Sequence, residues 1–193
     1  EIIQKALEDV SNPPILIEYV DKVAGNKRSD FADLKHCLDY ETEINKFIGK
    51  EYKHSLPSDE WNSIALNYTS GTTGNPKGVV YHHRGAYLNA IGNTLTWDLP
   101  MHPKYLWTLP MFHCNGWCFP WTLSALIGTH VCLREVRAEP IWAALSEHRV
   151  TYLCGAPIVM SLIVTAPQEV KRELEQTVEF FTAAAPPPER VLA

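Results

Sequence analysis

The chain carries, at residues 68–79, the stretch Tyr-Thr-Ser-Gly-Thr-Thr-Gly-Asn-Pro-Lys-Gly-Val. Its three glycines allow backbone conformations that other residues avoid, so that amide groups can turn toward a bound anion. Three threonines and one serine add hydroxyl donors, and Lys77 adds a compact positive charge. Polyphosphate needs this combination because its oxygens must be hydrogen-bonded while its charge is neutralised. The stretch therefore predicts a phosphate-binding loop.

This loop differs from a Walker loop, in which Gly precedes the Lys and Ser or Thr follows it. Here Pro76 precedes Lys77 and Gly78 follows it, which disfavours a P-loop hydrolase. The next residues, 79–81, are Val-Val-Tyr and predict a strand, so no helix dipole is expected at the anion. A plain surface hairpin is the alternative interpretation, since Gly/Thr/Ser loops often bind nothing.

Short apolar runs alternate with helical periodicity on both sides of the loop. We expect strands at residues 15–20, 64–68, 79–81, 105–109, 130–133, 151–154 and 178–182. We expect helices near residues 3–10, 40–48, 87–95, 117–127, 141–148 and 158–165, with loops at 21–35, 50–62 and 110–116. Gly128 is placed to end the fourth helix. This alternation predicts an α/β fold with largely parallel strands.

Composition fits a globular chain, with 46% hydrophobic and 20% charged residues. The net charge is −5 and the basic residues do not cluster, so no nucleic-acid partner is expected. No apolar run is long enough for a transmembrane segment. Five cysteines at irregular spacing predict a reduced compartment, most simply the cytoplasm, with organellar targeting left open. Pro100 and Pro103 mark a boundary between a first subdomain at residues 1–98 and a second at residues 99–193.

Three later stretches contain further sequence motifs. Residues 109–117 read Leu-Pro-Met-Phe-His-Cys-Asn-Gly-Trp, residues 150–157 read Val-Thr-Tyr-Leu-Cys-Gly-Ala-Pro, and residues 182–188 read Thr-Ala-Ala-Ala-Pro-Pro-Pro. Taken singly, each is an ordinary core segment or stiff turn. In this order behind the loop at 69–78, the set resembles the adenylate-forming superfamily and within it the acyl-CoA synthetase branch. The resemblance implies the layered αβαβα architecture of that superfamily's large domain, present here in part.

The resemblance also implies site residues. It assigns nucleotide binding to Thr69, Ser70, Gly71, Thr72, Thr73, Gly74, Asn75, Pro76 and Lys77 and, on the adenine side, to Ala183, Ala184, Ala185 and Pro186. It assigns the acyl pocket to His113, Trp117, Gly155, Ala156 and Pro157. Lys77 and His113 are the expected catalytic residues, and Thr72 is expected to contact the Mg²⁺ ion that is bound together with ATP. Ala183 departs from the family pattern, which often has Gly there.

In that family a carboxylate attacks the α-phosphate of ATP, and coenzyme A then displaces AMP to give a thioester. ATP, Mg²⁺ and coenzyme A are therefore the implied cofactors. Family segments that supply a Mg²⁺-binding Glu, a ribose-binding Asp and a C-terminal catalytic Lys are not found, so we expect an internal fragment that is inactive by itself. The alternative is a stand-alone nucleotide-binding module or pseudoenzyme, and the flanking sequence would decide.

The stretch at residues 109–117 narrows the substrate class. Amino-acid adenylation domains carry an Asp there to bind the substrate ammonium, whereas this chain has Phe112, His113 and Cys114. A simple monocarboxylate of short or medium chain length is expected. The string is most similar to plant acyl-activating enzymes and to methylmercaptopropionate–CoA ligases, and bulky Trp117 is expected to shorten the acyl pocket.

Overall fold

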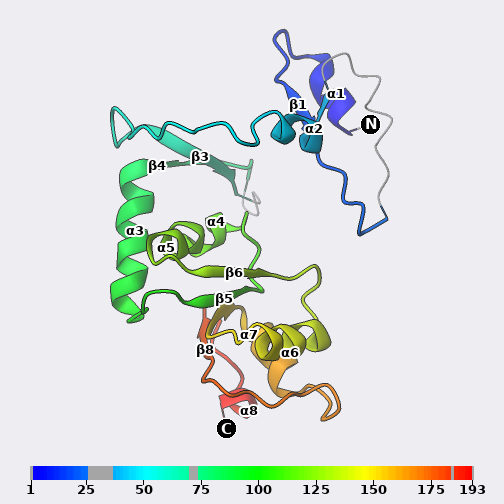
Figure 1. Cartoon of the computed structure of the whole chain (residues 1–193), viewed down its shortest axis with the longest axis vertical. Helices are drawn as coiled ribbons and strands as arrows, with labels where there is room; N and C mark the ends of the chain where they lie inside the picture. Colours follow the sequence, from blue (N-terminus) through cyan, green and yellow to red (C-terminus); the bar gives the residue numbers. More distant parts are fainter. Residues whose placement is uncertain (1, 26–36, 70–73, 184, 193) are drawn as a thin grey trace. The chain divides into compact units, whose positions relative to one another are not determined.

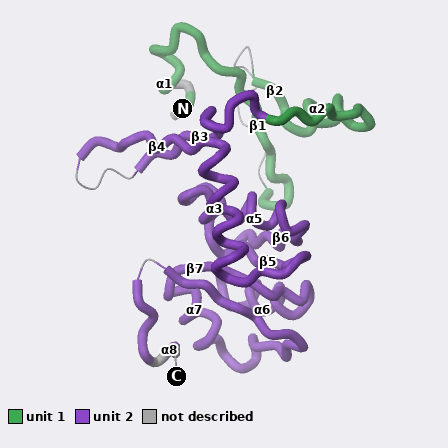
Figure 2. The backbone as a smooth tube through the Cα atoms, turned by 90° about the vertical axis from the view of Figure 1, so that its left-hand side faces the viewer, with its two compact units in different colours: residues 1–56 green, residues 57–193 purple. Residues whose placement is uncertain are grey.

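The structure is a computed structural model that describes residues 2–25, 37–69, 74–183 and 185–192. Contacts divide the chain into two compact units, residues 1–56 and residues 57–193 (Figure 2). All four predicted site segments lie in the second unit. The predicted subdomain boundary at 98–99 falls inside that unit, between its two sheets, and stays a prediction.

The first unit is small and largely exposed. It contains α1 (Ile2–Glu8), β1 (Leu16–Glu18), β2 (Cys37–Asp39) and α2 (Tyr40–Asn45), with β1 and β2 paired in parallel. The strand expected at 15–20 is therefore confirmed in its centre, whereas β2 was not predicted. Residues 26–35 of the expected loop lie outside the described residues.

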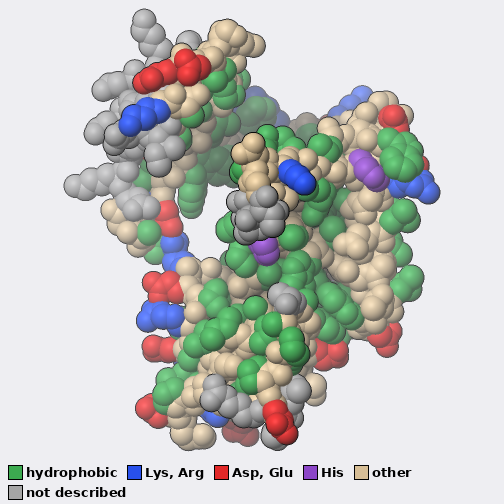
Figure 3. Space-filling view, turned by 180° about the vertical axis from the view of Figure 1, so that it is seen from behind, with side chains coloured by type: hydrophobic (Ala, Val, Ile, Leu, Met, Phe, Trp, Pro, Cys, Tyr) green, Lys and Arg blue, Asp and Glu red, His purple; other side chains and the backbone are tan. Residues whose placement is uncertain are grey.

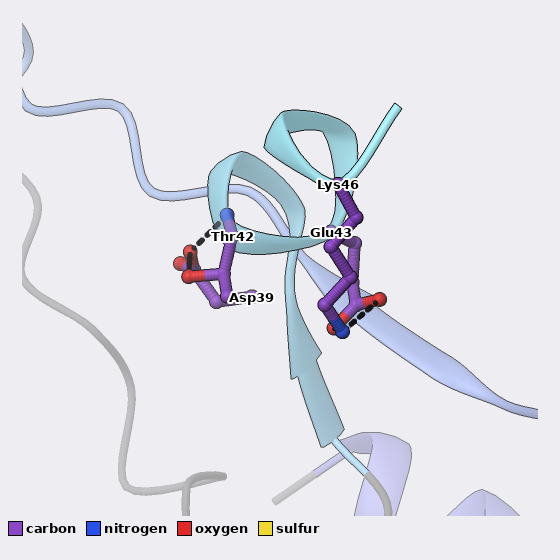
Figure 4. A network of polar contacts seen from close by, with 4 residues as sticks. All are labelled: Asp39, Thr42, Glu43 and Lys46. Atoms are coloured by element: carbon purple, nitrogen blue, oxygen red, sulfur yellow. Dashed lines mark hydrogen bonds and ion pairs between the residues drawn. The ribbon is translucent and has the colours of Figure 1, made fainter. Parts of the chain in front are cut away.

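Local hydrogen bonds determine where α2 starts. Asp39 caps the helix: its Oδ1 accepts from the Thr42 amide at 2.8 Å and from the Thr42 hydroxyl at 2.7 Å (Figure 4). Lys46 Nζ and Glu43 Oε1 form an ion pair one turn later, at 2.6 Å. The helix ends four residues before Gly49, which has a φ of +77°.

The second unit begins with a hairpin followed by a helix. Strands β3 (Ser63–Tyr68) and β4 (Gly78–His82) pair antiparallel, and α3 (His83–Thr96) starts directly after β4. The strand predicted after the glycine-rich loop is thus confirmed. The apolar stripe of α3 does not face the core, because Tyr87, Leu88 and Leu95 are all more than half exposed. Small residues, Ala86 and Ala90, are buried instead.

A parallel four-stranded sheet forms the rest of the unit, in the order β6-β5-β7-β8. Its strands are β5 (Lys104–Trp107), β6 (Thr129–Cys132), β7 (Tyr152–Gly155) and β8 (Glu179–Thr182). The intervening and following helices are α4 (Cys114–Trp117), α5 (Phe119–Ala125), α6 (Ala138–Glu147), α7 (Pro157–Val164) and α8 (Glu189–Leu192). The predicted α/β class with parallel strands is confirmed.

Side chains alternate between the two faces of this sheet. Tyr105 and Trp107 join one buried cluster with Phe119 and Leu123 of α5, whereas Leu106 joins a second cluster with Ile141 of α6. Figure 1 shows the corresponding layers, with α5 on one side of the sheet and α6 and α7 on the other. This three-layer arrangement buries both faces of the sheet, as parallel sheets require.

Two of the predicted helices are longer than the observed ones: the helix expected at 40–48 ends at Asn45, and the one expected at 117–127 is shorter at both ends. The helix expected at 117–127 spans only Phe119–Ala125, because Cys118 before it and Ile127 after it both have positive φ. The Gly128 amide closes the end by donating to the Leu123 carbonyl at 2.7 Å. Within the described residues, no helix is both long enough and apolar enough to cross a membrane.

Candidate active site

Three of the four predicted site segments leave the sheet at the same edge. Since β5, β7 and β8 are parallel, the loops that follow Trp107, Gly155 and Thr182 all emerge at their carboxyl ends. Ligands of open α/β sheets bind at this edge. The Thr108 hydroxyl donates to the Cys154 carbonyl at 2.5 Å and ties the first two loops together.

The turn after β7 lies next to the end of β8. Gly155 pairs with Thr182, and a Cβ at Gly155 would lie 3.1 Å from the Val159 Cβ, so the backbone approaches α7 closely there. Ala156 precedes α7, and Pro157 is its first residue. The adenine-side loop follows Thr182: Ala183, Ala185 and Pro186 are exposed, and Ala184 lies outside the described residues.

The segment that carries His113 has an unusual backbone. Five consecutive residues have φ between +43° and +63°: Cys114, Asn115, Gly116, Trp117 and Cys118. They form a left-handed turn, in which the Gly116 amide donates to the His113 carbonyl at 2.9 Å. This conformation costs about 1–2 kcal/mol for each L-residue other than Gly, less for Asn, so surrounding contacts must maintain it.

Gly116 is the residue that the turn most requires. A Cβ at this position would lie 2.7 Å from Cζ3 and 3.0 Å from Cη2 of Trp107. Trp107 is buried and its Nε1–H donates to Nδ1 of His130 at 3.0 Å, so the indole cannot move away easily. The turn is therefore packed directly onto the sheet.

The base of the predicted phosphate loop is closed by two hydrogen bonds. The Thr69 amide donates to the Lys77 carbonyl at 2.9 Å, and the Lys77 amide donates to the Thr69 hydroxyl at 3.1 Å. Residues 74–77 are exposed. Ser70, Gly71, Thr72 and Thr73 lie outside the described residues, so the predicted Mg²⁺ contact of Thr72 stays a prediction.

A cavity of about 720 Å³ joins the loop base to the left-handed turn. Thr69 and His113 both line it, which brings together the first two predicted segments. Its other lining residues are Leu66, Asn67, Tyr68, Val79, Tyr81, Phe112 and Cys114. The cavity is large enough for a nucleotide-sized ligand.

A second cavity, of about 300 Å³, lies beside the first. Tyr81 lines both cavities, and the left-handed turn contributes Cys114 to the larger one and Cys118 to the smaller one. The remaining lining residues of the smaller cavity come from β4 and α3: Val80, His82, Gly85, Ala86 and Asn89. Tyr81 and the turn therefore stand between the two spaces.

Tyr81 was not among the predicted site residues. Partial burial raises the pKa of its phenol, and the neighbouring thiol groups of Cys114 and Cys118 raise it further. The hydroxyl is accordingly protonated at neutral pH and can donate a hydrogen bond into either cavity. Period-two alternation along β4 could have indicated it, because Val79 and Tyr81 share the face that lines the larger cavity.

Trp117 lies apart from both of these cavities. It is partly buried and packs against the cluster formed by Tyr105, Trp107 and Phe119, and its carbonyl accepts from Asn93 Nδ2 at 2.9 Å. Its predicted role as a wall of the acyl pocket stays a prediction.

The five cysteines are free thiols, and among the described residues no group of three or more His, Cys, Asp or Glu side chains could hold a metal ion.

Comparison with known proteins identifies the family. The model of the family described as "AMP-binding enzyme" matches residues 3–193. Acetate/butyrate–CoA ligase AAE7 of Arabidopsis thaliana, named as peroxisomal, is 47% identical over 180 residues, which are 93% of this chain and 32% of the relative. Acetate–CoA ligase CCL3 of Humulus lupulus is 44% identical over 184 residues and is covered to the same 32%. The chain thus spans about a third of the length of these curated relatives.

Solved structures agree on the fold. The N-terminal domain of FACL13 from Mycobacterium tuberculosis matches 98% of this chain with a TM-score of 0.75 at 20% identity, and this chain covers 49% of that domain. O-succinylbenzoate coenzyme A synthetase from Bacillus subtilis, solved with ATP and magnesium, matches 97% of the chain with a TM-score of 0.68 at 19% identity. These likenesses confirm the expected large-domain fold, present in part. By its sequence match over nearly its whole length, the chain belongs to the AMP-binding enzyme family.

Proposed function

We propose that this chain is part of an ATP-dependent acid–thiol ligase. In the first step a carboxylate oxygen attacks the α-phosphorus of ATP, and the bond to the pyrophosphate oxygen breaks. The coenzyme A thiol then attacks the acyl carbon of the acyl-AMP, and AMP leaves as the thioester forms. Both steps develop charge on phosphoryl oxygens, which amide groups, hydroxyl groups and cations of a preorganised site stabilise.

One observation carries this proposal: Thr69, at the base of the phosphate loop, and His113 line the same cavity. The loop hydroxyls and Lys77 would hold the β- and γ-phosphates at one end. His113 would then lie beside the α-phosphate and the carboxylate. The adenine would rest near Ala183, Ala185 and Pro186, at the same sheet edge.

Mg²⁺ is proposed to accompany ATP. Among the hydroxyl groups of the loop, we propose that of Thr72 as the contact, since hydroxyl oxygens are suitable ligands for this hard cation. The ion would neutralise phosphate charge. The residues described around the cavity, Thr69 and Tyr81 among them, would orient the nucleotide and exclude water.

We propose a short monocarboxylate as the acid. Three relatives are named as ligases of short acids: one of acetate or butyrate, one of acetate alone and one of 2-methylpropanoate. No acidic residue lines the larger cavity, so no partner for a substrate ammonium is present among its described residues.

For the compartment we propose the cytoplasm, with the peroxisome as the alternative that the names of two relatives suggest. Imaging of the tagged protein decides between them.

The test is acid-dependent ATP–pyrophosphate exchange by the full-length protein that carries this segment. We expect exchange with acetate, butyrate or 2-methylpropanoate and none with glycine or alanine, followed by thioester release when coenzyme A is added. Residues 1–193 alone are expected to form no acyl-CoA. Binding of ATP without exchange for any acid would contradict the ligase proposal and favour a nucleotide-binding module.

A further inference from the structure

The left-handed turn at residues 114–118 is held from two sides by asparagine side chains. Asn67 Nδ2, on β3, donates to Asn115 Oδ1 at the centre of the turn. Asn93 Nδ2, on α3, donates to the Trp117 carbonyl at 2.9 Å and to the Thr122 hydroxyl at 3.2 Å. The first contact crosses 48 residues of sequence and is the one that reaches the proposed active site.

Asn67 occupies a position where local preferences do not favour Asn. It lies within β3, opposite Val79, and Asn is depleted in strands. Its side chain is half-buried and faces the same side of the strand as Thr69, two residues later. The strand that leads into the phosphate loop is thus bonded to the turn that follows His113.

The His113 ring depends on this turn for its direction. Among the described residues the ring has no hydrogen-bond partner and makes no cap contact with α4. The hydrogen bonds that His113 makes with described residues come from its backbone: its amide donates to the Pro110 carbonyl at 3.1 Å, and its carbonyl accepts from the Gly116 amide. Where the ring points therefore follows from the conformation of residues 114–118.

We propose that Asn67 is a positioning residue, which clamps the left-handed turn through Asn115 and so aims His113 into the cavity beside the phosphate loop. The catalytic part of this inference rests on the proposed ligase function. The clamp itself does not, because it is a property of the folded chain. The two can therefore be tested separately.

The first test uses the chain alone and reads the turn through its cysteines. Cys114 is exposed, Cys118 is 6% exposed and Cys154, in the sheet, is fully buried. Iodoacetamide labelling, resolved by mass spectrometry, should modify Cys114 and spare the other two thiols. In Asn67→Ala we expect Cys118 to label about tenfold faster, because the turn opens locally, while Cys154 stays protected.

Aspartate variants provide a matched control. With Asn67→Asp, the Asn115 amide can rotate and donate to the new carboxylate, and with Asn115→Asp, Asn67 can still donate. Each single variant should keep Cys118 protected. In the double variant Asn67→Asp/Asn115→Asp, two carboxylates face each other and neither can donate a hydrogen bond. Its Cys118 should therefore label about as fast as in Asn67→Ala. Unchanged protection of Cys118 in both Asn67→Ala and the double variant, or joint exposure of Cys118 and Cys154, overturns the clamp.

The second test reads adenylation in the full-length protein. Asn67→Ala should lower kcat about tenfold with the KM for ATP within about twofold, because the ring is misdirected while the phosphates still bind. Asn67→Asp should recover most of that loss. A rise in KM without a fall in kcat overturns the positioning role. A wild-type protein without exchange activity but with the labelling pattern above rejects the ligase function and leaves the clamp in place.

Discussion

Replacing Gly116 with Ala tests the packing of the left-handed turn most directly. The residue has a φ of +54°, which costs an L-residue about 1–2 kcal/mol. The added methyl group would also meet Trp107, 2.7 Å from its Cζ3, and overpacking of this kind costs about 1–3 kcal/mol. Trp107 is hydrogen-bonded to His130 and packs edge-to-face against Tyr105, so its ring cannot move away freely. We expect the free energy of unfolding to fall by about 2–5 kcal/mol.

The matched control is Gly92→Ala in α3. No atom lies within 4 Å of a Cβ at Gly92, and its backbone is helical, so alanine should stabilise by about 0.5–1 kcal/mol. Urea unfolding of both variants, followed by tryptophan fluorescence, measures the two changes. The reasoning is refuted if Gly116→Ala unfolds at the wild-type urea concentration, or if both variants shift in the same direction.

Three further expectations concern chemistry and pH. In the full-length protein, Lys77→Ala should slow adenylation more than thioester formation from supplied acyl-AMP, because the contacted phosphates leave as pyrophosphate; equal loss in the two half-reactions would indicate a folding defect. Trp117→Ala should raise kcat/KM for longer acids several-fold relative to acetate, and an unchanged acid profile with lower stability would refute the pocket role. Burial raises the pKa of the Cys154 thiol from 9.0 to about 12. Its contribution to stability is therefore complete below pH 9 and is lost as the pH rises toward 12. Urea unfolding at pH 8 and pH 10 should show a loss of about 1 kcal/mol in the free energy of unfolding, which Cys154→Ala lacks.

The sheet of the second unit was predictable because its strands are short apolar runs between turn residues. β5 and β7 fall within two residues of the predicted bounds. β2 was missed because three residues beside a polar stretch carry no usable period. The orientation of α3 was also not readable: its large apolar residues suggested a core face, but close approach to α5 requires the small side chains of Ala86 and Ala90.

The candidate site was predictable only in its segments. Family resemblance pointed to the loop at 69–78 and to His113, and the structure brings Thr69 and His113 to one cavity. The left-handed turn escaped prediction because, apart from Gly116 and Asn115, its residues rarely adopt positive φ. The bond between Asn67 and Asn115 joins polar residues far apart in sequence, and no periodicity indicates such a pair.

The order in which strands pair also has a consequence during synthesis. The hairpin of β3 and β4 closes over a short loop, so it can form within microseconds of leaving the ribosome. β5 instead pairs with β7, whose residues emerge more than forty positions later, at Tyr105 with Tyr152 and Leu106 with Leu153. At ordinary translation speeds the apolar strand β5 waits for seconds with that edge unpaired. A nascent chain stalled between α5 and β7 should therefore be a strong chaperone substrate, whereas one stalled after β8 should not.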